Sequence, residues 1–207
     1  RGGAGEVYVL YGRTDLPDSD EVGRQAAQRT RNLLGSKKIP TEVLPLIIEN
    51  RVAARLVNGF LQAMTGQSLQ QKRSFLLGMK GEQVGSKVFS LVDDPLIMHG
   101  MGSRLYDDDC FAALRREVVK EGRLLEFFID WYYSRKLECE PTTSWPSNLL
   151  LLPGSRNVEA IMKDLGRGIW ITDFIGGNSN STTGDFSVGI IGQLFDHGQF
   201  VHPVSEM

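Results

Sequence analysis

The sequence predicts an α+β fold in which a curled, mainly antiparallel β-sheet, similar to a barrel or a sandwich, packs against helices. The first observation is a segment, 51–64, whose apolar residues repeat every three or four positions, as on one face of a helix. The second is a carboxy-terminal stretch, 165–207, with the alternation of half-buried strands. The third is a pair of similar hairpin patterns, turned at Glu121-Gly122 and at Asp196-His197-Gly198.

The carboxy-terminal stretch is expected to form three strands. Ile169 and Ile171 fall on the same face of the first strand, because side chains alternate along a strand. Gly198 supplies the positive φ that a three-residue hairpin needs. After the first strand, the chain is expected to form a polar, glycine-rich loop, a second strand, a tight turn and a third strand, at 176–185, 186–195, 196–198 and 199–204.

Helix caps, the spacing of apolar residues, and residues that end helices or strands predict the elements that precede residue 165. Asp18 and Glu21 have the spacing of a capping box, and Gly35 is placed to end the helix that they begin. Ser68 and Gln71 suggest a second helix start. An apolar stretch at 7–11 opens the chain. The predicted helices are 18–34, 51–64, 68–77, 131–137 and 158–165, and the predicted strands are 43–48, 88–92, 116–120, 123–129 and 149–152.

Composition narrows the function classes. The 207 residues are 41% hydrophobic and 23% charged, which is ordinary for a globular protein. The net charge of −2 gives no basic field, so direct nucleic-acid binding is not expected. Cys110 and Cys139 form neither a CxxC motif nor a disulfide framework, so a cytoplasmic location is expected. With no run of 18 apolar residues and no visible signal peptide, no membrane association is expected.

An ordered set of motifs carries a family resemblance. A strand leads into Gly176-Gly177-Asn178, followed by Thr183-Gly184-Asp185-x-Ser187-x-Gly189, an x-Gly hairpin and Pro203-Val204. This set resembles the carboxy-terminal signature of the TldD/PmbA family, whose members are described as peptidase-related proteins and modulators of DNA gyrase. Further matching motifs occur in the expected order at 81–84, 92–95, 146–149 and 153–154.

The resemblance extends from about Asp18 to Val204 and implies a domain organisation. Residues 1–40 are expected to be the end of an amino-terminal domain plus a linker helix, and 41–207 a TldD/PmbA-type carboxy-terminal domain that is incomplete at its end. The chain is therefore expected to be roughly the carboxy-terminal half of a longer protein. One segment, 138–145, is shorter than the glycine-rich loop of the family.

The resemblance also implies where a metal would bind. In the TldD-like branch, a helix bearing His-Glu-x-x-x-His binds zinc, and its Glu can serve as general base. The matching helix here, 51–64, contains neither His nor Glu. Asn58 and Gln62 stand near the vestigial ligand positions, but neutral amides are poor zinc ligands. The chain therefore resembles the PmbA branch, also called TldE, with no catalytic residue, no metal and no cofactor expected in this chain. Zinc is expected only in a TldD-like partner.

The other candidate sites in the sequence have simpler interpretations. His197 and His202 could approach each other across a hairpin, but a turn histidine and an edge-strand histidine are the simpler interpretation; His99 lies in a loop. The acidic run 107–109 lacks the ligand spacing of a calcium loop, which favours a solvated loop. Neither cysteine lies in an activating motif, and no Gly-x-Ser-x-Gly elbow occurs.

The polar loop at 176–185 has two interpretations. It is either a long turn that uses glycine and asparagine for positive φ, or the rim of a groove for a peptide or a partner subunit. An extended peptide could add to a strand edge beside it. The candidate peptide-groove or partner-contact residues are Gly176, Gly177, Asn178, Asn180, Thr183, Gly184, Asp185 and Ser187.

These observations lead to three functional hypotheses. The first is a PmbA/TldE-like, non-catalytic subunit of a metalloprotease assembly that binds unfolded peptides, paired with a TldD-like zinc-bearing subunit or with itself as a dimer. The second is a stand-alone peptidase with an atypical metal site, drawn from the three histidines or from segments outside this chain. The third is a regulator that acts on DNA gyrase or its partners.

Overall fold

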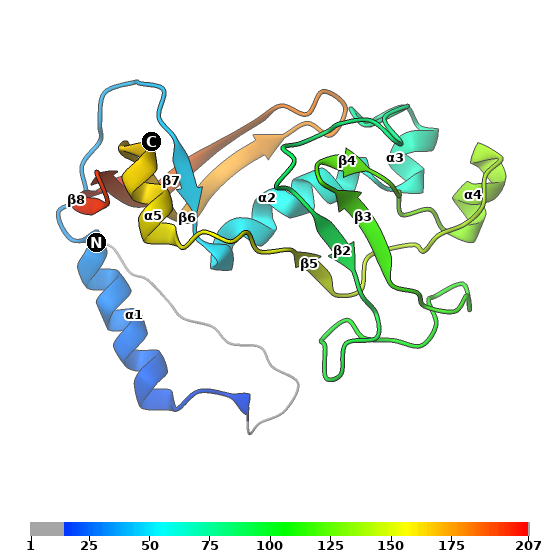
Figure 1. Cartoon of the computed structure of the whole chain (residues 1–207), viewed down its shortest axis with the longest axis horizontal. Helices are drawn as coiled ribbons and strands as arrows, with labels where there is room; N and C mark the ends of the chain where they lie inside the picture. The colour runs from blue at the N-terminus through cyan, green and yellow to red at the C-terminus, as the bar shows by residue number, and fades with distance from the viewer. Residues whose placement is uncertain (1–14, 207) are drawn as a thin grey trace. The chain divides into compact units, whose positions relative to one another are not determined.

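The computed structural model describes residues 15–206, and the apolar stretch at 7–11 lies outside them. The described chain divides into two compact units (Figure 1). The first comprises the described residues up to Val57 together with 155–179 and those from 186 onward. The second comprises 58–154 and the short turn 180–185. Among the described residues, no helix has the length and apolar character needed to cross a bilayer.

Helix α1, Ser19–Leu33, forms where the capping residues predict it. Asp18 is its N-cap, and the Asp18 Oδ1 accepts a hydrogen bond of 2.8 Å from the backbone N–H of Asp20. Gly35, with φ of +76°, follows its end as predicted. None of its residues is buried. Arg29 connects the helix to the rest of the unit through a two-point ion pair with Glu49, at 2.8 and 3.1 Å.

The sheet of the first unit contains β1 (Leu46–Ile48), β6 (Arg167–Ser179), β7 (Phe186–Asp196) and β8 (Gln199–Ser205), in the order β1-β6-β7-β8. Strand β1 pairs with β6 in parallel, and the other pairs are antiparallel, so this sheet is mixed. Helix α5, Val158–Leu165, has the predicted bounds and contacts β6 and β7. The buried core of the unit is formed by Ile169, Ile171, Phe174, Leu194 and Val204.

The sheet of the second unit contains β4 (Arg123–Leu124), β3 (Arg116–Lys120), β2 (Leu91–Asp93) and β5 (Leu149–Leu151), in that order, and every pair is antiparallel. Two short helices, α3 (Gly66–Gln70) and α4 (Trp131–Leu137), pack against each other beside it (Figure 1). The fully buried apolar side chains of this unit include Met64, Leu76, Leu91, Val118, Val119, Leu124 and Phe128.

The α+β class is confirmed, but the arrangement of the strands differs from the expectation of one curled sheet. The described strands form two separate four-stranded sheets, and neither closes into a barrel. Strand β1 begins only after Pro45, because proline lacks the N–H that a ladder needs. Strand β4 is two residues long, because the N–H groups of Leu125 and Glu126 both point to the carbonyl of Val118, at 2.9 and 3.3 Å, and interrupt the pairing.

The two predicted hairpins share one turn geometry. Glu121 and Gly122 have φ of +48° and +76°, and His197 and Gly198 have φ of +46° and +85°. Two successive residues with positive φ are typical of a two-residue type I′ turn, which matches the twist of the flanking strands. The pairing of Asp196 with Gln199 confirms a two-residue loop rather than the expected three-residue loop.

Helix α2, Asn50–Ala63, lies within one residue of the predicted helix at each end. It belongs to the first unit up to Val57 and to the second unit from Asn58. Helix α3 follows at once, capped by Thr65, whose Oγ1 accepts from the N–H of Ser68 at 3.2 Å. The prediction of a helix start at Ser68 was therefore wrong by one turn, because the structure uses an earlier hydroxyl as the cap.

Candidate functional site

Asn58 and Gln62, the vestigial positions named from the sequence, lie one turn apart on helix α2, and both are exposed. The side chains of this helix, Asn-Arg-Val-Ala-Ala-Arg-Leu-Val-Asn-Gly-Phe-Leu-Gln-Ala, include no histidine, cysteine or carboxylate. Proteins bind zinc through histidine, cysteine and carboxylate side chains. This helix has none of them, so it does not fit a zinc ion. Glu49, the carboxylate just before the helix, is held by Arg29 and lies 3.6 Å from Arg51.

The histidines have local partners. His197 Nδ1 lies 2.7 Å from the Oδ1 of its neighbour Asp196, and His202 Nδ1 lies 3.0 Å from the carbonyl oxygen of Pro203. His99 has a φ of +58° in its loop. Across residues 15–206, no group of three or more His, Cys, Asp or Glu side chains is arranged to hold a metal ion.

The acidic run 107–109 supports the local backbone and is not simply a solvated loop. Asp107 is buried, at 5% exposure, and its Oδ1 accepts from the N–H groups of Asp109 and Phe111 at 3.1 and 3.0 Å. Asp109 Oδ2 accepts from the N–H of Trp131 at 2.9 Å, at the start of α4. The expectation of a solvated loop was wrong for Asp107, because its buried carboxylate accepts hydrogen bonds from backbone N–H groups in place of a backbone carbonyl.

The first part of the predicted polar loop is in fact strand. Strand β6 continues to Ser179, and Asn178 pairs with Ser187 across the hairpin. The register shifts between Ile175 and Asn178, where Gly176 and Gly177 have φ of +54° and +114°. The two glycines therefore form a β-bulge that lets the pairing resume beyond it.

Arg55 of α2 holds the strand just before and at this bulge. Its Nη1 donates to the carbonyl oxygen of Phe174 at 2.8 Å, and its Nη2 donates to the carbonyl oxygen of Gly176. The guanidinium also lies over the Phe174 ring, 5.7 Å from the ring centroid. All these groups belong to the first unit, so Arg55 stabilises the bulge within that unit.

The turn at 180–185 is closed by its own hydrogen bonds. The N–H of Asn180 donates to the carbonyl of Asp185, and the N–H of Gly184 donates to the carbonyl of Asn180, both at 2.8 Å. Thr183 Oγ1 donates to Asp185 Oδ2 at 2.7 Å, and the side chains of Asn180, Thr183 and Asp185 are exposed. The turn is thus closed by internal hydrogen bonds, and its polar side chains are exposed.

Phe75 supports this turn within the second unit. Its N–H donates to the carbonyl of Ser181 at 2.9 Å. Gly184 has a φ of +83°, and a Cβ placed on it would lie 3.2 Å from the Phe75 ring. The Phe75 ring in turn packs near Phe60, with ring centroids 6.2 Å apart. The turn is therefore anchored to the aromatic side chains of its own unit.

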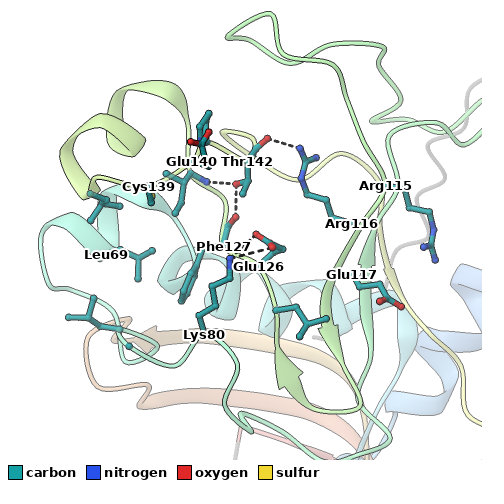
Figure 2. A pocket seen from close by; sticks show the side chains of 16 residues that line it. Leu69, Lys80, Arg115, Arg116, Glu117, Glu126, Phe127, Cys139, Glu140 and Thr142 are labelled. Atoms are coloured by element: carbon teal, nitrogen blue, oxygen red, sulfur yellow. Dashed lines mark hydrogen bonds and ion pairs between the residues drawn. The ribbon is translucent and has the colours of Figure 1, made fainter.

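A pocket in the second unit was not predicted (Figure 2). Its volume is about 900 Å³, at the upper end of the range for small-ligand sites. No linear motif indicates it, because its walls come from five separate segments of the chain that only the fold brings together. The lining residues that Figure 2 labels are Leu69, Lys80, Arg115, Arg116, Glu117, Glu126, Phe127, Cys139, Glu140 and Thr142.

Thr142 organises one wall of this pocket. Its Oγ1 donates to the carbonyl of Phe127 at 2.6 Å and accepts from the N–H of Ile129 at 2.9 Å. Arg116 donates to the carbonyl of Thr142 at 2.7 Å (Figure 2). It also donates to the carbonyl of Leu114 at 2.9 Å. Hydrogen bonds therefore join this wall directly to β3 and to the segment after β4.

Comparison with known proteins places these features in a family. The model of the PmbA/TldA metallopeptidase C-terminal domain matches residues 41–207. The chain is 29% identical over 196 residues to the metalloprotease PmbA of Escherichia coli O157:H7, which covers 94% of this chain and 44% of that protein. The chain thus spans less than half the length of this relative.

Two solved structures are similar in fold. A candidate modulator of DNA gyrase from Bacteroides thetaiotaomicron matches with a TM-score of 0.89 and 36% identity, over 94% of this chain and 44% of that one. TldE from Thermococcus kodakarensis matches with a TM-score of 0.80 and 22% identity, over 89% of this chain and 45% of that one, and shares the fold. By the family match over 41–207 and the order of its motifs, the chain belongs to the PmbA/TldD family.

Proposed function

We propose that this chain is part of a PmbA/TldE-like subunit that is non-catalytic and acts in a metalloprotease assembly together with a TldD-like, zinc-bearing subunit. The observation that carries the proposal is the surface of α2. Family resemblance points to this helix for zinc binding, yet its exposed positions 58 and 62 hold Asn and Gln. Neutral amides supply neither the zinc ligands nor the general base that a zinc peptidase uses.

The role proposed for the subunit is to bind unfolded peptides for processing. The turn at 180–185, with exposed Asn180, Thr183 and Asp185, offers polar groups to a peptide or a partner. Within the first unit, Asn178 and Ser187 pair with each other beyond the bulge at 176–177 and are further polar candidates. Functional groups carried by fixed turns on a sheet are common in binding proteins, because the scaffold limits the entropy lost on binding.

Co-expression with a zinc-bearing relative from the same organism tests this proposal. The two proteins should co-purify as a stable complex on size-exclusion chromatography, and the complex should cleave an unfolded substrate such as casein. This chain alone should show no cleavage, with or without added zinc. A matched control replaces the glutamate of the partner's zinc motif with glutamine, which should keep the complex and remove cleavage, because the general base is lost.

The same experiment separates the alternatives. Cleavage by this protein alone would favour a stand-alone peptidase and contradict the proposal. Two inert proteins that elute separately would also contradict it. A regulator of DNA gyrase, the role in the description of the Bacteroides thetaiotaomicron structure, would be favoured by a change in supercoiling activity without any proteolysis.

A further inference from the structure

The floor of the pocket in the second unit is apolar. Leu69, Phe127 and Ile129 line it with only 6%, 7% and 8% of their surface exposed, while Leu77 keeps 49% exposed. Leu125, Leu137 and Pro141 complete the apolar lining. A single large aliphatic or aromatic side chain would fit within the volume of about 900 Å³. Burial of such a side chain contributes about 1.5–3 kcal/mol, so the floor favours an apolar group.

The charged side chains at the rim are mostly paired already. Lys80 lies 3.3 Å from Glu126 (Figure 2). The other rim pairs are Arg115 with Asp94 at 3.6 Å, Glu117 with Lys120 at 3.1 Å, and Arg116 with two backbone carbonyls. The ion-paired charges compensate one another, whereas Arg116 keeps its positive charge while its Nη1 and Nη2 donate to the two carbonyl oxygens.

Glu140 is the exception at this rim. Its side chain is exposed and makes no ion pair or hydrogen bond with any residue in the part of the chain that the structure describes. An unpaired carboxylate next to an apolar floor favours an occupant that carries a positive charge beside an apolar group.

The backbone on both sides of Glu140 is fixed. The N–H of Cys139 donates to the carbonyl of Ser134 at 3.1 Å, which closes the end of α4. The N–H of Thr142 donates to the carbonyl of Ile129 at 2.8 Å. Between them, Pro141 restricts its own φ. The carboxylate is thus carried by an ordered segment, so less conformational entropy is lost when it binds a ligand.

We infer that this pocket binds a peptide segment in which a large apolar side chain stands next to a cationic group. The apolar side chain contacts the floor formed by Leu69, Phe127 and Ile129, and the cationic group pairs with Glu140. A lysine or arginine side chain and a free peptide amino terminus share this chemistry. The inference deepens the proposed function, since it assigns a preference to the unfolded peptides that the subunit binds.

Fluorescence anisotropy with short, unstructured peptides tests the inference on the full-length protein in the absence of its partner. The reference peptide has Leu-Lys at its centre, blocked ends and a fluorophore at its carboxy end. Replacing its leucine with alanine should weaken binding about tenfold, from the lost apolar burial. The Glu140→Gln variant should bind the Leu-Lys peptide about two- to fivefold more weakly, the range of an exposed ion pair, and a Leu-Gln peptide unchanged.

Two further variants make the result specific. Glu159→Gln removes the same charge from α5 in the other unit and should leave both affinities unchanged. Leu77→Arg places a cation in the pocket at a half-exposed position and should weaken the Leu-Lys peptide more than tenfold while melting near the wild-type temperature. A peptide with leucine at a free amino terminus and no lysine shows whether the terminal amine or the side-chain amine is preferred.

Equal affinity of the wild-type chain for the Leu-Lys and Leu-Gln peptides would overturn the inference. An equal loss in Glu140→Gln and Glu159→Gln would do the same, as would the absence of binding to any peptide. These outcomes are independent of the assembly test. A chain without this peptide preference can still form an active complex with its partner, and a chain that fails to form that complex can still bind these peptides.

Discussion

Phe128→Ala is expected to lower the free energy of unfolding of the second unit by about 3–5 kcal/mol, the usual cost of removing a buried phenylalanine ring. Phe128 is 2% exposed. Its N–H donates to the carbonyl of Met64 at 3.0 Å, and its carbonyl accepts from the N–H of Gly66 at 2.8 Å, so its backbone joins the end of α2 to α3. The truncated side chain would leave a cavity at this junction, next to the pocket residues Phe127 and Ile129.

Urea unfolding followed by tryptophan fluorescence measures the effect, because Trp131 and Trp145 report on the second unit and Trp170 on the first. Phe186→Ala is the matched control. Phe186 is 62% exposed, so its truncation should change stability by no more than about 0.5 kcal/mol. If the two variants lose similar stability, Phe128 is not the core residue described above.

Gly177→Ala is expected to destabilise the β6–β7 hairpin by about 2–6 kcal/mol. Gly177 has a φ of +114°, which side chains rarely adopt, and such strain costs about 1–3 kcal/mol. A Cβ on Gly177 would also lie 2.5 Å from Val188 Cγ1 and 2.9 Å from the carbonyl oxygen of Ser187, and overpacking adds about 1–3 kcal/mol. Thermal unfolding, followed by circular dichroism, measures the loss.

Its neighbour provides the control. Gly176 has a φ of +54°, and a Cβ on it would meet nothing within 4 Å, so Gly176→Ala should cost only about 1–2 kcal/mol, the left-handed penalty alone. Equal losses in the two variants would show that the bulge does not fix Gly177 as described. If the hairpin also takes part in partner binding, Gly177→Ala should weaken the complex with the zinc-bearing subunit more than Gly176→Ala does.

Elements with local signals were predicted well. Helices α4 and α5 have the predicted bounds, and each begins at a side chain that can accept from the first turn. Asp130 accepts from the N–H of Tyr133 at 2.7 Å, and Asn157 accepts from the N–H of Ala160 at 2.9 Å. A helix cap and the repeat of apolar residues that follows it lie within a few positions of each other, so the sequence alone can locate them.

Features that depend on distant partners were not predicted. The parallel pairing of β1 with β6 joins Leu46 to Ile169, and an apolar run does not reveal the direction of its partner strand. Gly176 and Gly177 were assigned to a loop, because glycine is typical of both turns and bulges and only the pairing partner decides between them. The pocket was missed for the same reason, since it joins segments as distant as Leu69 and Thr142.

The sequence indicates where the candidate residues lie in the fold, and their role in binding stays a prediction. Asn58 and Gln62 are exposed on α2, where the sequence places them, and the polar residues of the 180–185 turn are exposed as well. Neither Arg55, which supports the bulge, nor Phe75, which supports the turn, was singled out. Both donate to backbone carbonyl groups of residues more than a hundred positions away, and the pattern of side chains along the sequence does not reveal such contacts.

The most direct test of the account is the metal content of the full-length protein, purified without chelator and measured by inductively coupled plasma mass spectrometry. We expect much less than one zinc per chain for this protein alone. We expect about one zinc per complex after co-purification with the zinc-bearing relative, together with peptidase activity. One stoichiometric metal per chain in the protein alone would contradict the account, because it would require a metal site in this subunit.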